Sequence, residues 1–399
     1  MRATLRRLKR QLAQGWYWLA HAGFPFHWPA PGATPAMARR RRFGRRMLRA
    51  RWPFWLRPFA CLLMTLLWPL GAWREARKEA ATAPRPVGAA GLWRIAVRHN
   101  LSPREILRYG ADRPGAPCPD GWICQHEMVR TLPVLNTAEA TALAWDKAAF
   151  ARFCLERDLP AIPTLAEWRG TTRSGFPAEA WPERIVLKPV FSSKGQGVEL
   201  WHRDGTDFRR GEVVLGLPEL EGRGALLGQH IGALMVQPAL SPHLDLTNAG
   251  MAGMPITRLV TGCWPDGSVE VIEAFWVAPA QGRFASNSGG EHVWLVDAGC
   301  GEILPTPEDF YGKWTGPEVV GMVLPGWAEA IDLVRRAHGH FPDPCVALGW
   351  DVALTPDGPV LIEANTGISS TLDQTLRHEP SGAGRMGELV DAWLSRSSW

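Results

Sequence analysis

The hydrophobic and polar positions of this chain change their period along its length. Residues 59–68 form an apolar run that only Thr65 interrupts, and residues 91–135 show helical spacing with loops between. From about Glu183 onward, short apolar runs alternate with turn residues, which is typical of strands. The pattern predicts strands at 184–191, 198–202, 233–239, 256–263, 268–277 and 292–297.

Capping and breaking residues predict where helices begin and end. The sequence Ser102-Pro103-Arg104-Glu105 is typical of a capped helix start. A further helix is predicted to open near Thr137 and to run through Asp146 and Lys147 to the prolines after Leu159. Residues 80–90 indicate a linker, and further helices are predicted at 326–338 and 383–396.

The stretch Asp351–Gly367, DVALTPDGPVLIEANTG, predicts a tight hairpin. A three-residue loop of Pro-Asp-Gly would place Thr355 opposite Pro359 and Asp351 opposite Glu363. Asn365 would share their face. Two opposed carboxylates repel each other, and a hard cation such as Mg²⁺ would offset the repulsion. We therefore expect a metal site here, the alternative being a solvated hairpin with ordinary surface acids.

A glycine-rich loop, SSKGQG at Ser192–Gly197, lies between two predicted strands. Its backbone N–H groups suit a polyphosphate, but no helix follows, so it is neither a P-loop nor a Rossmann turn. A plain hairpin turn is the alternative. Lys188 shares an apolar strand face with Val186 and Val190, where a lysine needs an anionic partner.

Composition indicates how many domains the chain can form and the redox state of its compartment. A chain of 399 residues is long enough for two or three domains with a substantial core. Its seven cysteines include no CxxC pair, which favours a reducing compartment over a disulfide framework or a zinc site. We find no GxSxG and no convincing Cys/His pair, and we interpret His230, His243 and His292 as structural.

Charge is distributed unevenly. Residues 1–74 hold 15 Lys and Arg and no acid, which leaves 29 basic against 39 acidic residues in the remainder. Tryptophans bracket the apolar run, but Arg57, Pro58 and Pro69 leave it too short for a membrane span. We expect an in-plane or shallow anchor on an anionic membrane surface through residues 39–78. Three other interpretations stay open. The apolar segment could be an ordinary core helix, and the first forty residues could be disordered or an overcalled start. Nucleic-acid binding is the third, which no recognised motif supports and which we do not expect.

In this order and spacing, several motifs resemble the ATP-grasp superfamily over about residues 137–375. The closest resemblance is to the sugar-transfer-associated ATP-grasp group, which is related to α-L-glutamate-ligase-like proteins. The motifs are DKAAFARFCLERDLPAIPT, VLKPVFSSKGQG, MVQPAL, ITRLVTG, SNSGGEHVWLVDAGCGEI and GWDVALTPDGPVLIEANTG.

The resemblance implies an α+β chain whose two α/β lobes grip ATP between antiparallel sheets. The expected domains are a basic, partly apolar helical arm (1–80), a helical pre-domain (81–136) and the ATP-grasp domain (137–399).

The resemblance also implies roles for single residues. Lys147 and Lys188 would contact the nucleotide, and Arg258 would meet phosphate or the reacting carboxylate, so that Arg258 and Lys188 are the expected catalytic residues. One departure is Gln237, where many relatives have glutamate. The remaining expected contacts are the phosphate loop Ser192, Ser193, Lys194, Gly195 and Gly197, the adenine hinge Met235, Val236 and Gln237, and the Mg²⁺ ligands Asp351, Glu363 and Asn365.

The resemblance implies a cytoplasmic ligase that uses ATP and Mg²⁺ to form an acyl phosphate and pass the acyl group to an amine. Its expected substrates are small or glycan-linked carboxylates and amines, in cell-surface polysaccharide or glycoconjugate biosynthesis. We expect the enzyme to be peripheral on the inner face of the membrane. The alternatives are a kinase of a sugar or polyol hydroxyl, and a non-catalytic ATP-binding module that recruits glycan enzymes.

Overall fold

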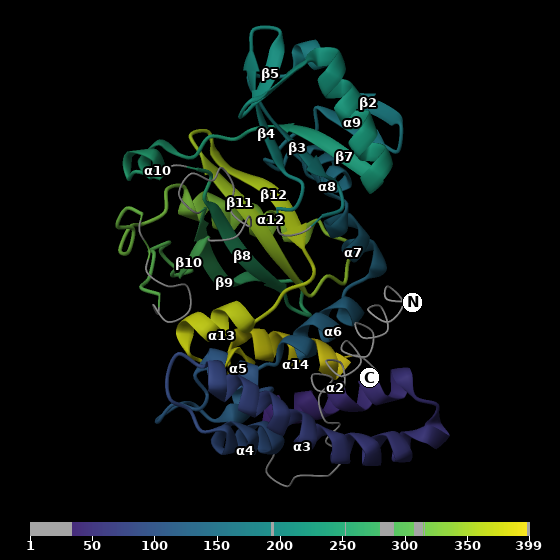
Figure 1. Ribbon diagram of the computed structural model, residues 1–399, viewed down its shortest axis with the longest axis vertical. Coiled ribbons are helices and arrows are strands. Elements are labelled where there is room, and N and C mark those ends of the chain that lie inside the picture. Colours follow the sequence, from purple (N-terminus) through teal and green to yellow (C-terminus); the bar gives the residue numbers. More distant parts are fainter. Residues whose placement is uncertain are drawn as a thin grey trace. The chain divides into compact units, whose positions relative to one another are not determined.

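The structure is a computed structural model that describes residues 34–192, 195–251, 253–279, 291–306, 314 and 316–396 (Figure 1). Its contacts divide the chain into two compact units. The first unit combines Met1–Leu135 with Gly367–Trp399, and the second is Asn136–Thr366. Residues 367–399 therefore fold with the N-terminal part of the chain, whereas the sequence pattern grouped them with the domain 137–399.

The second unit holds two antiparallel sheets and so has the predicted α+β architecture (Figure 1). The seven-stranded sheet has the order β2-β1-β7-β3-β4-β5-β6, and the five-stranded sheet has the order β10-β9-β8-β11-β12. The strands of the first are β1 (Ala166–Arg169), β2 (Thr172–Gly175), β3 (Arg184–Pro189), β4 (Glu199–Asp204), β5 (Asp207–Arg210), β6 (Val213–Gly216) and β7 (Ala233–Pro238). Those of the second are β8 (Ile256–Cys263), β9 (Val269–Ala278), β10 (His292–Leu295), β11 (Ala347–Thr355) and β12 (Gly358–Asn365).

Helices cover these sheets. They are α7 (Ala138–Trp145), α8 (Lys147–Leu155), α9 (Leu217–Ile231), α10 (Leu244–Asn248) and α12 (Trp327–Gly339). The single long helix predicted from Thr137 is wrong, because the chain breaks at Asp146. The Asp146 side chain accepts hydrogen bonds from the N–H groups of Ala148 and Ala149, and so caps α8. Lys147 consequently occupies the first position of a helix.

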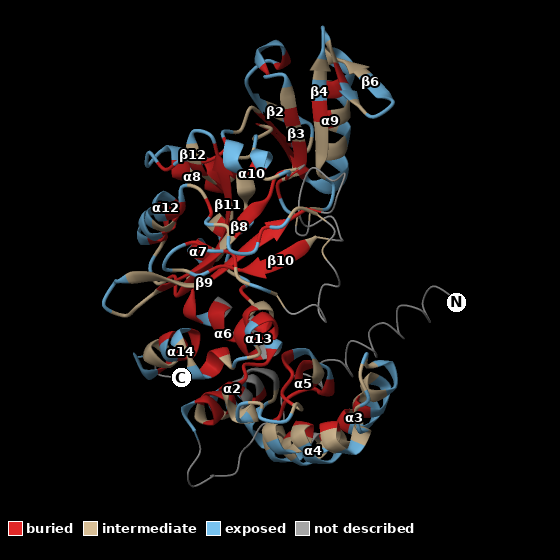
Figure 2. Ribbon diagram, turned by 90° about the vertical axis from the view of Figure 1, so that its left-hand side faces the viewer, coloured by how far each residue is buried: buried red, intermediate tan, exposed pale blue. Residues whose placement is uncertain are grey.

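One face of the five-stranded sheet forms the main core of the second unit. Trp350 on β11 and Trp276 on β9 are fully buried there, together with Leu333 and Val334 of α12. Figure 2 shows that β8 and β11 are buried along most of their length. Because successive strand residues point to opposite faces, Arg258 and Asp351 project from the face opposite to this core.

The first unit is helical. Its core packs Trp68, Leu92, Ile106 and Trp122 around Tyr109, whose ring stacks on that of Trp122 at 5.1 Å. The predicted cap at Ser102 is confirmed as a full capping box with Glu105. The helices are α2 (Pro35–Arg51), α3 (Arg57–Thr82), α4 (Ala89–His99), α5 (Pro103–Tyr109), α6 (Gln125–Leu135), α13 (Thr371–Arg377) and α14 (Arg385–Arg396), with short 3₁₀ turns that include η1 (Phe54–Leu56).

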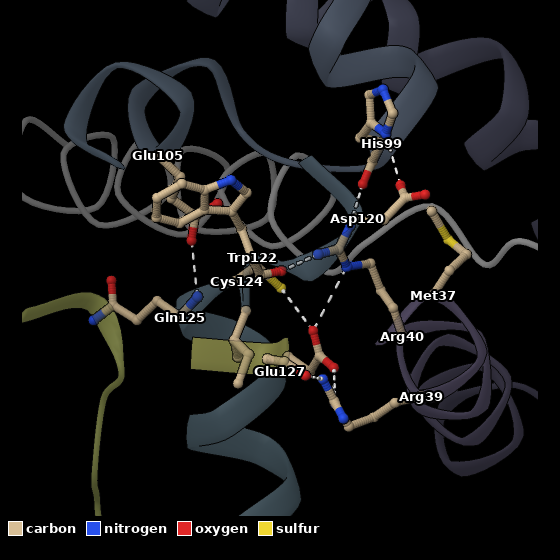
Figure 3. Close-up of polar contacts among 12 residues, drawn as sticks. Met37, Arg39, Arg40, His99, Glu105, Asp120, Trp122, Cys124, Gln125 and Glu127 are labelled. Atoms are coloured by element: carbon tan, nitrogen blue, oxygen red, sulfur yellow. Dashed lines mark hydrogen bonds and ion pairs between the residues drawn. The ribbon is translucent and has the colours of Figure 1, made fainter. Parts of the chain in front are cut away.

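Two arginines of the basic segment are internal (Figure 3). Arg39 and Arg40 of α2 are 2% and 3% exposed, and both pair with the buried Glu127 of α6, at 3.3 Å and 3.6 Å. Arg39 also contacts Asp391 of α14 at 2.6 Å, and Arg40 donates to the backbone carbonyl of Trp122. These two positions therefore anchor α2 within the first unit and are not available to a membrane, unlike the surface role expected for residues 39–78.

Candidate functional site

The candidate site lies on the face of the five-stranded sheet opposite to the main core, around the buried Asp351 of β11. Asp351 pairs with Arg258 on β8 and with Glu363 on β12. Gly349 pairs with Asn365, so the carboxylates and the amide share one face, as the hairpin pattern predicts.

The hairpin reaches this pairing by a different route from the one predicted. Its loop has two residues, Pro356 and Asp357, because Thr355 pairs with Gly358. The register is corrected by a bulge, since Asp351 pairs with Glu363 while Val352 pairs with Leu361. The predicted three-residue loop is thus wrong by one position, and the bulge at Ile362 compensates for it.

Asp351 is held by Arg258 through two parallel contacts. Arg258 Nε lies 2.8 Å from Asp351 Oδ1, and Nη2 lies 2.9 Å from Oδ2. This fork geometry is the strong form of an arginine–carboxylate pair. Asp351 is buried, whereas about a third of the Arg258 side chain is exposed. Arg258 therefore neutralises Asp351 while part of its side chain stays exposed.

Glu363 is neutralised by a different cation. Lys147 Nζ lies 3.4 Å from Glu363 Oε2, and the same amine donates to the backbone carbonyl of Ser192. Asn365 Nδ2 donates to Glu363 Oε1 at 3.3 Å. The break at Asp146 thus places Lys147 between the β11–β12 hairpin and the start of the glycine loop, and its two contacts link the two sheets at this point.

Lys188 of β3 is the unusual cation of the group. It is 8% exposed, and no carboxylate of the described residues lies within ion-pair distance of it. Burial lowers the pKa of Lys188 to about 8, an effect that Glu363 partly opposes and Lys147 reinforces. A buried lysine without an ion-pair partner is costly, and a bound anion would remove that cost.

The glycine loop joins β3 to β4, so it connects two strands as predicted. Gly195 and Gly197 have φ angles of +63° and +75°, which favour glycine. A Cβ at Gly197 would also lie 2.9 Å from Pro189 Cγ. The expected phosphate contacts Ser193 and Lys194 lie outside the described residues.

The expected adenine hinge on β7 is divided between two faces. Met235 lies directly opposite Lys188 and packs near the start of α8, whereas Val236 belongs to the core beneath α9. Gln237 donates from Nε2 to the Ile162 carbonyl, and its buried Oε1 has no hydrogen-bond partner among the described residues. Met235 and Gln237 thus share the face of Lys188, and Gln237 Oε1 can accept a hydrogen bond from a ligand.

The donor set of the hairpin suits Mg²⁺. Asp351, Glu363 and Asn365 offer two carboxylates and an amide oxygen, the hard ligands that Mg²⁺ accepts together with water and phosphate. In the described part of the chain, no group of three or more His, Cys, Asp or Glu residues could hold a metal ion. The site therefore fits a metal that arrives with further oxygen ligands, and not one held by the protein alone.

The three histidines that we interpret as structural each contact a neighbouring residue. His230 hydrogen bonds to the Leu226 carbonyl, and His243 caps α10 by accepting from Asp245 N–H. His292 packs on Trp294 at 4.3 Å between ring centroids. These contacts favour structural roles for the three side chains.

Sequence reasoning missed the Arg258–Asp351 pair. Arg258 and Asp351 are 93 residues apart in the sequence, and their contact depends on β8 pairing with β11. The only sequence signal was one charged side chain in each of two otherwise uncharged strands. Such a pattern identifies both residues as candidates but does not give the strand order that joins them.

Comparisons with known proteins give distant similarities only. A scan against protein-family models and a search of the curated proteins each found no match. Among solved structures, the chain is similar to a D-alanine–D-alanine ligase from Bacillus anthracis complexed with ATP, at 14% identity and a TM-score of 0.38, over 64% of this chain and 67% of that one. It is also similar to an L-amino acid ligase from Bacillus licheniformis, at 13% identity and a TM-score of 0.33, over 59% and 43%. A third is an ATP-grasp superfamily protein from Archaeoglobus fulgidus, at 12% identity and a TM-score of 0.33, over 65% and 55%.

Proposed function

We propose that the chain is an ATP-grasp enzyme that uses Mg²⁺ and ATP to join a carboxylate to an amine through an acyl phosphate. The observation that carries this proposal is Lys188, a buried cation that has no ion-pair partner among the described residues and lies near Lys147, Glu363 and Asp351. Three cations, Lys147, Lys188 and Arg258, lie at this site and can pair with the oxygens of a polyphosphate.

The ion pairs of the site indicate how ligand binding would proceed. Arg258 now neutralises Asp351, and Lys147 neutralises Glu363. When a polyphosphate is bound, Arg258, Lys147 and Lys188 would pair with its oxygens, and Asp351, Glu363 and Asn365 would hold the metal. Mg²⁺ would supply neutralisation of the charge on the phosphate oxygens.

For this reaction the protein has to position the substrates and stabilise the charge on the phosphate oxygens. Lys188 is buried on its strand, so its charge acts in a medium that screens it weakly. The exposed part of Arg258 can contact a reacting carboxylate or the phosphoryl group that it receives. The glycine loop offers backbone N–H groups between β3 and β4. No side-chain nucleophile is needed for acyl phosphate formation.

We also propose a biosynthetic pathway for the enzyme. The resemblance to the sugar-transfer-associated group favours a small or glycan-linked carboxylate and an amine as substrates, in cell-surface polysaccharide or glycoconjugate biosynthesis. It rests on the order of the motifs and is an associational argument. With ATP as a substrate, the catalytic site would face the cytoplasm.

The test is product analysis by mass spectrometry, with purified protein, ATP and Mg²⁺ against fractionated cell extract. A ligase releases ADP and phosphate only when both acyl donor and amine are present, and gives a product lighter by one water than their sum. A kinase would instead leave phosphate on its product. ADP formation that is absent with every fraction, together with normal ATP binding, would favour the non-catalytic module.

A further inference from the structure

Helix α3 carries an exposed apolar face that the ligase function does not use. The face is formed by Phe59, Leu62, Leu66, Leu70 and Trp73, hereafter the α3 stripe. These side chains are between 41% and 65% exposed. Their spacing of three and four residues places them along one side of the helix. Such a continuous exposed apolar face marks an interaction surface.

The opposite side of α3 is fixed to the first unit. Trp68, Ala72 and Ala76 are buried against α4 and α5, and Trp93 of α4 donates from Nε1 to the Pro69 carbonyl at 2.9 Å. Figure 2 shows buried and exposed positions along α3. The helix is therefore amphipathic in its packing. One side is part of the protein core, and the other side is exposed, apart from the edge contact of Trp73 with the ring of Trp93 of α4 at 6.1 Å between centroids.

Exposed basic residues lie on and next to this helix. Arg74, Arg77 and Lys78 are exposed at the C-terminal half of α3. On α2, Arg42, Arg45 and Arg49 are exposed, in contrast to the buried Arg39 and Arg40. The stripe itself contains no acid, and the first acidic residue of the chain is Glu75. This combination of apolar and basic side chains is complementary to an anionic lipid surface, which offers both acidic headgroups and hydrocarbon.

The described part of the chain includes one helical stretch, Phe54–Thr82, that is long and apolar enough to cross a membrane by composition. Two features argue against a span. Only 16 residues separate Arg57 from Arg74, and a helix of that length reaches about 24 Å, short of the hydrocarbon core of about 30 Å. Crossing would also carry α4 into the bilayer with its exposed Arg94 and Arg98.

We propose that the α3 stripe inserts in the plane of an anionic membrane surface, with α3 parallel to that surface. The exposed Phe54 and Trp55 of η1 extend the apolar face at its N-terminal end. The surrounding arginines and Lys78 contact lipid headgroups, and the packed side of α3 keeps the first unit above the membrane. This surface is independent of the ATP site, so either proposal can fail without the other.

The test is flotation of the full chain with vesicles of phosphatidylcholine alone or mixed with phosphatidylglycerol, at low and high salt. The informative variant is Leu62→Glu with Leu66→Glu, and the matched control is Leu226→Glu, an exposed leucine on α9 of the second unit. We expect the wild type and the control to float on anionic vesicles only. The double variant should lose at least about tenfold in vesicle affinity.

Size-exclusion chromatography and thermal unfolding accompany the flotation. Because Leu62 and Leu66 are exposed, the double variant should unfold at the wild-type temperature. Equal flotation of all three proteins, or flotation of none, would overturn the proposal. So would a wild-type dimer that the double variant converts to a monomer without any vesicle binding, because the stripe would then be a contact between two copies of the chain.

Discussion

Asp351 and Glu363 face each other across β11 and β12, yet a different cation neutralises each carboxylate. Arg258 holds Asp351, and Lys147 lies 3.4 Å from Glu363. A metal alone would have to displace these cations without giving them a new partner. A metal that arrives with a polyphosphate gives both cations a partner. Binding of the metal at this site should therefore be stronger when a nucleotide is bound, and the reverse.

This dependence gives the first prediction. Mg²⁺ without nucleotide should bind at least about tenfold more weakly than in the presence of a non-hydrolysable ATP analogue. Isothermal titration calorimetry of the metal, with and without the analogue, measures the difference after correction for metal bound by the free analogue. Equal affinities in the two titrations would mean that Asp351 and Glu363 do not leave Arg258 and Lys147 to bind the metal when nucleotide is present.

The second prediction concerns Glu363. Glu363→Gln keeps the size of the side chain and removes its charge, so Mg²⁺-dependent ADP formation should be abolished while the melting temperature stays close to that of the wild type. Asp357→Asn is the matched control, because Asp357 is an exposed acid in the turn of the same hairpin. If the two variants show the same activity, the hairpin does not hold the catalytic metal.

The third prediction separates binding from stability at Lys188. Lys188→Met should weaken ATP binding by roughly 1.5–3 kcal/mol, the scale of a lost charge-assisted hydrogen bond. The same change should raise the free energy of unfolding of the nucleotide-free protein at pH 7 by about 1–3 kcal/mol, because it removes a buried charge that has no ion-pair partner among the described residues. Calorimetry and chemical denaturation test the two parts, with the exposed Lys78→Met as control. A variant that binds ATP normally contradicts the proposed function.

A fourth prediction follows from the pKa of Lys188, which burial lowers from 10.5 to about 8. Between these two values the unfolded chain binds more protons than the folded one, so the contribution of this group to stability rises with pH from about 8 to 10.5. ATP affinity should change in the opposite direction and decline above pH 8, because binding then requires proton uptake. Lys188→Met should lack both pH dependences, and an unchanged profile in that variant would assign them to another group.

The fifth prediction tests the buried ion pairs of α2. Glu127→Gln leaves Arg39 and Arg40 buried without their shared countercharge, so the free energy of unfolding should fall by about 3–5 kcal/mol. Glu79→Gln removes the partner of the exposed Arg104 and should cost less than about 1 kcal/mol. Urea denaturation of the two variants compares them directly, and similar losses would mean that the Arg39–Glu127 pair is not a structural anchor.

Much of the five-stranded sheet was predictable because its strands are long and apolar and its hairpin has a proline and a glycine in the turn. Strands β1, β2, β5 and β6 were not predicted, since each has four residues and β2 reads TRSG. Helix α9 was also missed, because Gly222, Gly224 and Gly228 weaken its pattern. Two of these glycines have a packing reason, as a Cβ at Gly224 or Gly228 would lie 2.7 Å from Trp168.

The burial of individual arginines in the basic segment could not be predicted from their number. In the sequence, Arg39 to Arg42 form a uniform run, and nothing local distinguishes one arginine from the next. The structure buries Arg39 and Arg40 against Glu127, which is 88 residues from Arg39, and leaves Arg42 exposed. The difference depends on how α2 packs on α6, and such tertiary contacts are not encoded in a charge count.

The nested arrangement of the two units has a consequence for biosynthesis. Residues 136–366 are one continuous segment, whereas the first unit is completed only when residues 367–399 have been made. On the ribosome, the inserted unit can therefore fold before the unit that precedes it. During that interval Arg39 lacks its partners Asp391 and Gly387, and the α3 stripe belongs to an unfinished helical unit. Attachment of the nascent chain to a membrane before termination would thus involve an arm that has not yet acquired its final packing.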